Sequence, residues 1–193
     1  PYLQIEPTSF CNYRCIFCYQ TDKNLTTKAN GHLGKMSLEL FKEIIDQSYK
    51  NIEFISLASR GEPLMCPKIE EMLEYTSGKF LNLKINTNAS LLNESKCHAI
   101  LSGGVKTLVF SADAADHIMY SQFRVNGKLD TVLKNIELFN KIKDNQYKNS
   151  KIITRVSGVK VSENQDFDEM EKFWGSMVDQ VAFVNYIASE NVY

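Results

Sequence analysis

SFCNYRCIFCY, residues 9–19, carries three cysteines in the pattern C-x3-C-x2-C, namely Cys11, Cys15 and Cys18. The segment follows directly on Tyr2–Glu6, whose short apolar pattern predicts a β-strand. Thiolates this close together can reach one metal centre from a single loop, and sulfur ligands favour zinc or iron–sulfur centres over hard cations. A structural zinc site takes four protein ligands, and neither a fourth clustered cysteine nor a suitably spaced histidine follows. Three cysteines would instead leave one iron of a four-iron cluster open, which is typical of a reactive position.

The composition is that of an ordinary globular protein of 193 residues, with 44% hydrophobic and 23% charged residues and a net charge of -1. Without a basic excess, we expect neither a nucleic acid nor an acidic membrane surface as partner. No apolar run is long enough to span a bilayer. The start at Pro1 shows no initiator methionine and no signal peptide, so we expect a segment of a longer, cytoplasmic protein. The odd count of five cysteines argues against a closed disulfide framework.

Apolar segments rich in β-branched residues alternate with amphipathic segments along the chain. The segments expected to form strands are Tyr2–Glu6, Ile52–Ala58, Leu81–Thr87, Val105–Ser111, Ile152–Val159 and Gln180–Ile187. Those expected to form helices are Ser37–Tyr49, Pro67–Lys79, Glu94–Leu101, Leu129–Lys143 and Asp166–Met177. Such alternation predicts an α/β fold with a parallel sheet and right-handed crossovers. The elements are too few for an eight-fold barrel, so we expect a partial (βα)6 TIM-like barrel in one domain, residues 1–193. Tyr19–Lys35 is expected to be a long, polar, mobile loop.

The cysteine pattern, with the aromatic Phe17 before the third cysteine, resembles that of the radical S-adenosylmethionine (SAM) superfamily. The resemblance implies a [4Fe–4S] cluster on Cys11, Cys15 and Cys18, whose open iron binds the amino and carboxylate groups of SAM. It further implies that the reduced cluster cleaves SAM to a 5′-deoxyadenosyl radical, which abstracts hydrogen from a small-molecule or peptide substrate. An electron donor such as flavodoxin or ferredoxin is implied as a partner. The substrate itself, a peptide, a sugar or another molecule, is left open, because a fold does not select it.

The end of the second expected strand supports this resemblance. Residues 59–64, SRGEPL, are similar to the Gly-Gly-Glu-Pro motif of the family, which contacts the methionine amino group. The resemblance therefore implies that Gly61, Glu62 and Pro63 bind the cofactor. Glycine allows backbone to approach a ligand closely, and a carboxylate accepts hydrogen bonds from an ammonium group. Arg60 stands where the family has its first glycine.

Two further strand ends carry polar residues that match the family. Asn88, in Asn86-Thr87-Asn88-Ala89, is similar to the asparagine of a Thr-Asn-Gly motif, with alanine in place of glycine. Ser111 and Asp113 stand in the place of a Ser-x-Asp motif. The resemblance implies that this hydroxyl and this carboxylate approach the ribose or the substrate.

Two arginines are candidates for the methionine carboxylate, because a guanidinium binds a carboxylate as a fork. Arg124, in Arg124-Val125-Asn126-Gly127, looks like the arginine of an Arg-x-x-Gly motif. Arg155 lies within the fifth expected strand, where it would face the lumen of the barrel and need a partner. The sequence leaves the choice between them open.

The last part of the chain, Phe173-Trp174-Gly175 and Val178–Val181, resembles members with a cysteine-rich C-terminal extension that binds auxiliary clusters. No such extension is present in this sequence. A second hypothesis is a non-catalytic iron–sulfur or zinc module in electron transfer or assembly. An electron-transfer cluster would need a fourth protein ligand, and no obvious one is offered.

Overall fold

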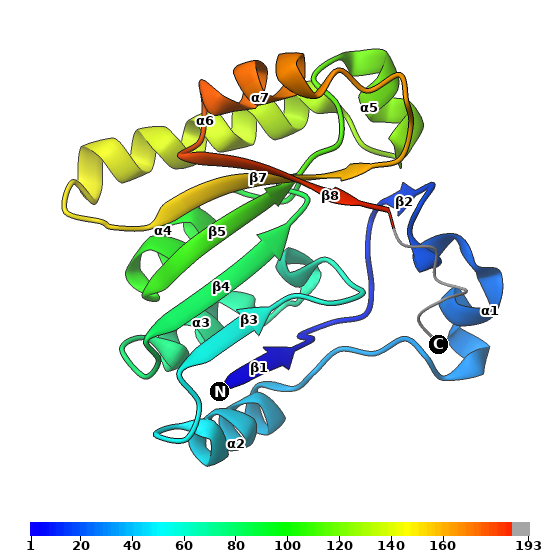
Figure 1. Cartoon of the computed structure of the whole chain (residues 1–193). Coiled ribbons are helices and arrows are strands. Elements are labelled where there is room, and N and C mark those ends of the chain that lie inside the picture. The colour runs from blue at the N-terminus through cyan, green and yellow to red at the C-terminus, as the bar shows by residue number, and fades with distance from the viewer. Residues whose placement is uncertain (187–193) are drawn as a thin grey trace.

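A six-stranded parallel sheet forms the centre of the molecule (Figure 1), in a computed structural model that describes residues 1–186. Its strand order is β1-β3-β4-β5-β7-β8, and every neighbouring pair is parallel. The strands are β1 (Tyr2–Ile5), β3 (Phe54–Leu57), β4 (Asn82–Thr87), β5 (Val105–Ser111), β7 (Ile153–Lys160) and β8 (Gln180–Asn185). The expected α/β fold with a parallel sheet is therefore confirmed. Ile187, which we placed at the end of the last strand, lies outside the described residues.

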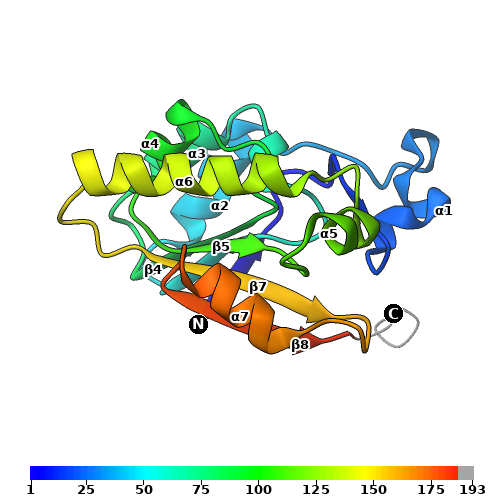
Figure 2. The same ribbon diagram turned by 90° about the horizontal axis from the view of Figure 1, so that it is seen from above.

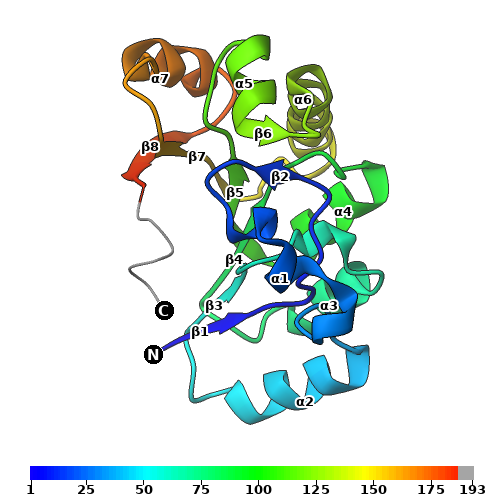
Figure 3. The same ribbon diagram turned by 90° about the vertical axis from the view of Figure 1, so that its right-hand side faces the viewer.

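Among the described residues, the helices that pack on this sheet lie on one of its faces (Figures 2 and 3). They are α2 (Leu38–Ser48), α3 (Ile69–Thr76), α4 (Glu94–Ser102), α6 (Leu129–Gln146) and α7 (Phe167–Gly175). Figure 3 shows the strands along an arc with these helices on its convex side. This arrangement is a partial barrel, as the strand and helix pattern predicts, and its concave side is the inner face.

The helix starts follow from local capping. Ser37 accepts a hydrogen bond from the backbone N–H of Leu40 (3.1 Å), and Asn93 accepts one from Lys96 (2.9 Å). Both residues satisfy a backbone donor that a helix N-terminus leaves free. One expected start is wrong, because α3 begins at Ile69 rather than at Pro67.

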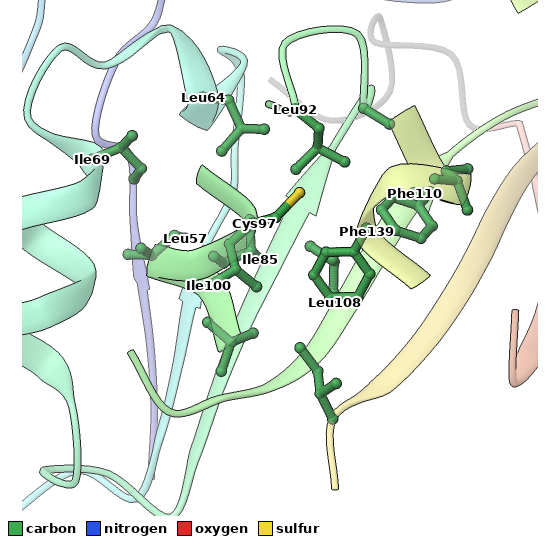
Figure 4. Packing of buried hydrophobic residues seen from close by; sticks show 14 of the residues in the cluster. Leu57, Leu64, Ile69, Ile85, Leu92, Cys97, Ile100, Leu108, Phe110 and Phe139 are labelled. Atoms are coloured by element: carbon green, nitrogen blue, oxygen red, sulfur yellow. The ribbon is translucent and has the colours of Figure 1, made fainter. Parts of the chain in front are cut away.

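The hydrophobic core lies between the sheet and the helices (Figure 4). Ile85 of β4 and Leu108 of β5 are fully buried there, together with Cys97 of α4. The rings of Phe110 and Phe139 meet edge to face, with centroids 6.2 Å apart, which is a favoured aromatic geometry. Cys97 thus behaves as a small buried hydrophobic residue, the usual role of an isolated cysteine.

The structure contains several short helices, strands and turns that the sequence did not predict. The two-stranded antiparallel pair β2 (Arg14–Cys15) and β6 (Arg124–Val125) joins the cysteine segment to the end of α5 (His117–Phe123). The expected loop Tyr19–Lys35 contains α1 (Lys23–Thr26) and two 3-10 turns, η1 (Tyr19–Thr21) and η2 (Lys28–Asn30). A third turn, η3 (Pro63–Met65), follows β3. Among residues 1–186, no helix combines the length and apolar content that crossing a membrane requires.

Candidate active site

A cavity of about 300 Å³ opens at the carboxyl ends of the strands, where α/β barrels place their functional residues. All three clustered cysteines line it, together with Phe17. The strand ends contribute Gly61, Glu62, Asn88, Ser111 and Ser157, and Arg124 completes the wall. The structure therefore brings most of the residues selected from the sequence to one place. Pro63, Asp113 and Arg155 are not among the lining residues.

The cysteine loop is held by its own backbone and by the β2–β6 pair. The N–H of Cys18 donates to the carbonyl of Cys15 (2.9 Å), and the N–H of Tyr13 donates to Cys11 Sγ (3.5 Å). Cys15 pairs with Arg124 across the two short strands, and Arg124 Nη1 donates to Cys15 Sγ (3.7 Å). Burial raises the pKa of all three thiols, so a bound cation is needed to favour their thiolate forms.

The donor set fits a [4Fe–4S] cluster better than a single zinc ion. Within residues 1–186, no three His, Cys, Asp or Glu side chains are arranged to hold one metal ion. A four-iron cluster binds each thiolate through a different iron, so its ligands need not converge on one point. Cys11, Cys15 and Cys18 around one cavity would therefore hold three irons of such a cluster, and the fourth would be open to a non-protein ligand.

Glu62 joins the end of β3 to the end of β4. Its Oε1 accepts hydrogen bonds from the Leu64 N–H (3.1 Å) and the Thr87 hydroxyl (2.6 Å), and its Oε2 accepts one from the Asn88 N–H (2.7 Å). The side chain is only 2% exposed, and burial raises its pKa while these hydrogen bonds oppose the shift. A carboxylate has about four lone-pair positions, so one position on Oε2 remains for a donor in the cavity.

Neighbouring backbone leaves no room for a side chain at Gly61. A Cβ on this residue would lie 1.8 Å from the carbonyl oxygen of Thr8. The next residue, Glu62, donates its N–H to the Phe10 carbonyl (2.8 Å). We had interpreted this glycine as a place where backbone approaches a ligand, and the structure shows that backbone of the segment before the cysteines makes the close approach. Pro63 begins the buried turn η3 and supports Glu62 from behind the cavity.

Arg60 stands where the family motif has its first glycine, and its hydrogen-bond partners lie outside the lining of the cavity. Its N–H donates to Glu6 Oε1 (2.7 Å), and its carbonyl accepts a hydrogen bond from Gln20 Nε2 (3.0 Å). Gln20 is 2% exposed and also donates to the Ser9 carbonyl (2.8 Å). This glutamine therefore ties both ends of the cysteine segment to the end of β3. Sequence reasoning missed it, because a glutamine in a polar stretch carries no motif.

Asn88 uses its side chain to position the loops around it. Its Nδ2 donates to Asn12 Oδ1 (2.9 Å), within the cysteine segment, and its Oδ1 accepts from the Ser90 N–H (3.0 Å). The next residue, Ala89, has a φ of 62°, in the left-handed region that favours glycine. This left-handed backbone explains why the family motif has a glycine here. In this chain an alanine adopts the same conformation.

Arg124 and Asp113 form a buried ion pair, with Nε 2.6 Å from Oδ2 and exposed fractions of 5% and 0%. Asp113 Oδ1 also accepts the N–H of Val159 (2.7 Å). Burial by itself would lower the pKa of Arg124, but the Asp113 carboxylate raises it above its ordinary value. We had expected the Asp113 carboxylate to approach the ribose or the substrate. The structure buries it instead, where it positions the guanidinium of Arg124, 5.8 Å from the centre of the Phe17 ring.

Arg155 lies away from the cavity, on the inner face of β7. Its Nε and Nη2 donate to Gln180 Oε1 of β8, at 2.9 and 2.6 Å. Ser157 and Val159, two and four residues further along the strand, are the residues of β7 that line the cavity. Of the two arginines that the sequence proposes for the methionine carboxylate, only Arg124 is therefore at the site.

We expect Glu62→Gln to lower the free energy of unfolding by about 1–3 kcal/mol, because three donors face the carboxylate. The best placement of the amide keeps its oxygen at the Oε1 position and turns its NH2 toward the Asn88 N–H, so that two donors face each other. Urea unfolding followed by circular dichroism measures the effect. Glu74→Gln, at an exposed position of α3, is the matched control and should change little. Equal stability of Glu62→Gln and the unaltered protein would show that the network contributes nothing.

A partial α/β barrel with three cysteines at the carboxyl ends of its strands defines a class of enzymes that bind an iron–sulfur cluster. A family model described as the radical SAM superfamily matches residues 5–173. The chain therefore belongs to the radical SAM superfamily, whose members use a [4Fe–4S] cluster and SAM. Its curated relatives are enzymes, so the second hypothesis, a non-catalytic module, is not supported.

Two curated relatives and one solved structure illustrate the similarity. A tungsten-containing aldehyde ferredoxin oxidoreductase cofactor-modifying protein of Pyrococcus furiosus is 30% identical over 114 residues, 58% of this chain and 30% of that protein. A GTP 3′,8-cyclase of Clostridium botulinum is 26% identical over 174 residues, 89% of this chain and 52% of that protein. SuiB of Streptococcus suis, bound to precursor peptide SuiA, has a TM-score of 0.74 at 21% identity, over 96% of this chain and 39% of SuiB. The chain thus spans about half or less of the length of these proteins.

Proposed function

We propose that this protein cleaves SAM reductively and uses the resulting radical to abstract a hydrogen atom from a peptide or another small substrate. The observation that carries the proposal is the single cavity lined by Cys11, Cys15, Cys18, Glu62 and Arg124. When bound, the cluster supplies one electron to the sulfonium of SAM, whose C5′–S bond breaks to give methionine and the 5′-deoxyadenosyl radical. The residues of the chain supply the binding and orientation that this chemistry needs.

The polar residues of the cavity match the two charged groups of the methionine moiety, its ammonium and its carboxylate. The remaining lone pair of Glu62 Oε2 is suited to accept a hydrogen bond from the ammonium group. Arg124 offers its Nη2, which has no hydrogen-bond partner among residues 1–186, to the carboxylate. Asp113 fixes the orientation of that guanidinium from behind. Gly61, Asn88 and Ser111 complete the proposed binding site for SAM.

One solved structure supports a substrate class for this chain, and the chemistry calls for an electron donor. SuiB is recorded with a precursor peptide, which supports a peptide as one substrate class for this chain. We infer a one-electron donor such as flavodoxin or ferredoxin as a partner, since the cluster must be reduced again for each SAM that it cleaves. We place the protein in the cytoplasm, because all five cysteines are free and reducing compartments preserve free thiols.

Anaerobic reconstitution of the chain with iron and sulfide, followed by reduction with dithionite, tests the proposal. We expect SAM to be converted to methionine and 5′-deoxyadenosine, even without the true substrate, and chromatography measures both products. A Cys15→Ala variant, treated identically, should form neither product. If protein that contains the cluster and binds SAM forms no 5′-deoxyadenosine, the proposal is wrong.

A further inference from the structure

The inner face of the sheet below the cavity carries two cations, Lys84 and Arg155, among polar and apolar side chains. Along β4, Leu83 and Ile85 belong to the core against the helices, so the alternate residues Lys84 and Asn86 face the concave side. The same alternation places Arg155 on the concave face of β7, because Val156 is in the core. No helix of residues 1–186 covers this side of the arc (Figure 3).

The strand register arranges these residues in two rows. Ser56, Lys84 and Thr107 are paired neighbours in one row. Asn86, Val109, Arg155 and Gln180 form the row above it, nearer the carboxyl ends. Asn86 also lines the cavity of the cysteines, so the upper row borders that cavity and the lower row lies one step nearer the amino ends of the strands. Strand spacing and rise place the backbones of Lys84 and Arg155 roughly 12 Å apart, within reach of one molecule between their long side chains.

The two cations of this face have no acidic partner. Neither Lys84 nor Arg155 forms an ion pair with a carboxylate within residues 1–186, and Arg155 is held only by the neutral amide oxygen of Gln180. Glu6, the acidic residue that follows β1 on the same face, is already bonded to Arg60. The positive charge of the inner face is therefore uncompensated by the described chain.

Unpartnered polar atoms accompany these cations. Ser56, in the same row as Lys84, is 1% exposed, and its hydroxyl has no hydrogen-bond partner within the described residues. Asn86 Oδ1, at the junction with the cavity, is likewise buried without a partner. Buried polar atoms are costly unless they are bonded, and most in native proteins are. Lys84 and Arg155, the two cations of this face, are suited to an anionic oxygen group.

We propose that Lys84 and Arg155 bind an anionic group, a carboxylate or a phosphate, of the substrate. This inference rests on the proposed function, because it gives the substrate its place between this face and the proposed SAM site. It assigns Arg155 to the substrate rather than to the methionine carboxylate. A substrate of this class carries its charge one or two side-chain rows of this face, about 7–14 Å along the strands, below the cavity in which hydrogen is abstracted.

Titration calorimetry with two probes, pyrophosphate and glutarate, tests this inference on the reconstituted protein. We expect at least one probe to bind the unaltered protein, and Lys84→Gln and Arg155→Gln each to weaken that binding about 10- to 100-fold. Arg155→Lys, which keeps the charge, should retain most of the affinity. Lys106→Gln, which removes one positive charge from the exposed amino end of β5, is the matched control and should bind like the unaltered protein.

The outcomes separate the possible sources of the anion. Stronger binding of pyrophosphate identifies a phosphate-bearing substrate, and stronger binding of glutarate identifies a carboxylate-bearing one. If neither probe binds, or if Lys84→Gln and Arg155→Gln bind as tightly as Lys106→Gln, the inference is overturned. Thermal unfolding of each variant shows that it is folded. Formation of 5′-deoxyadenosine by the unaltered protein needs neither probe, so a failed titration beside normal 5′-deoxyadenosine formation refutes this inference and leaves the proposed function standing.

Discussion

Cys15→Ala protein, reconstituted without oxygen, should contain almost no iron and lack the brown absorption of a [4Fe–4S] cluster. Three thiols line the cavity, and neither of the other two cysteines, Cys66 and Cys97, is among its lining residues. Two thiolates would have to hold the cluster in the variant, and the usual site provides four ligands. Cys11→Ala and Cys18→Ala should behave alike. Iron analysis per chain, together with the visible spectrum, measures the loss.

Cys66→Ala and Cys97→Ala are the matched controls for this experiment. Cys66 is 2% exposed with its Sγ 3.9 Å from Met72 Sδ, and Cys97 is fully buried in the core. Neither residue lines the cavity of the three clustered cysteines. Both variants should retain the iron content of the unaltered protein, at a modest cost in stability for a small cavity. If Cys66→Ala lost iron as severely as Cys15→Ala, the three-ligand assignment would be wrong.

The second large effect is expected for Asp113→Ala, which should lower the free energy of unfolding by about 3–5 kcal/mol. The substitution leaves the guanidinium of Arg124 buried at 5% exposure without its carboxylate partner. It also removes the acceptor of the Val159 N–H. Asp113→Asn keeps that acceptor and loses only the charge, so it should be less destabilising than Asp113→Ala. Urea unfolding with circular dichroism measures both variants.

Asp130→Ala is the control for Asp113→Ala. Asp130 is 84% exposed and lies 3.7 Å from His117 Nε2, an exposed pair that contributes little to stability. We expect its free energy of unfolding to change by less than about 0.5 kcal/mol. A result of the same size for Asp113→Ala would mean that Arg124 reaches solvent when its partner is removed, and the buried ion pair would then have no structural importance.

The sequence predicted the strands and helix starts that depend only on residues close together in the chain. Alternation in segments such as Leu81–Thr87 and the cap at Ser37 arise from neighbouring residues, and the structure has a strand and a helix start there. Boundaries were less accurate, as at Pro67, because a proline before a helix can occupy several positions outside it as well as the first turn. The short pair β2–β6 was missed, since two-residue strands have too little pattern to detect.

The spacing of Cys11, Cys15 and Cys18 by itself determined the class of chemistry, because three thiols on one loop lie close together in any fold. Tertiary structure alone decided which polar residues share that cavity. Glu62 meets Thr87 and Asn88 across 25 and 26 positions of the chain, and Arg124 meets Asp113 only after β2 and β6 pair. Tertiary structure also decided that Arg155 lies on the inner face below the cavity. Such partners are selected by strand order and register, which depend on packing of the whole sheet and leave no trace in local sequence.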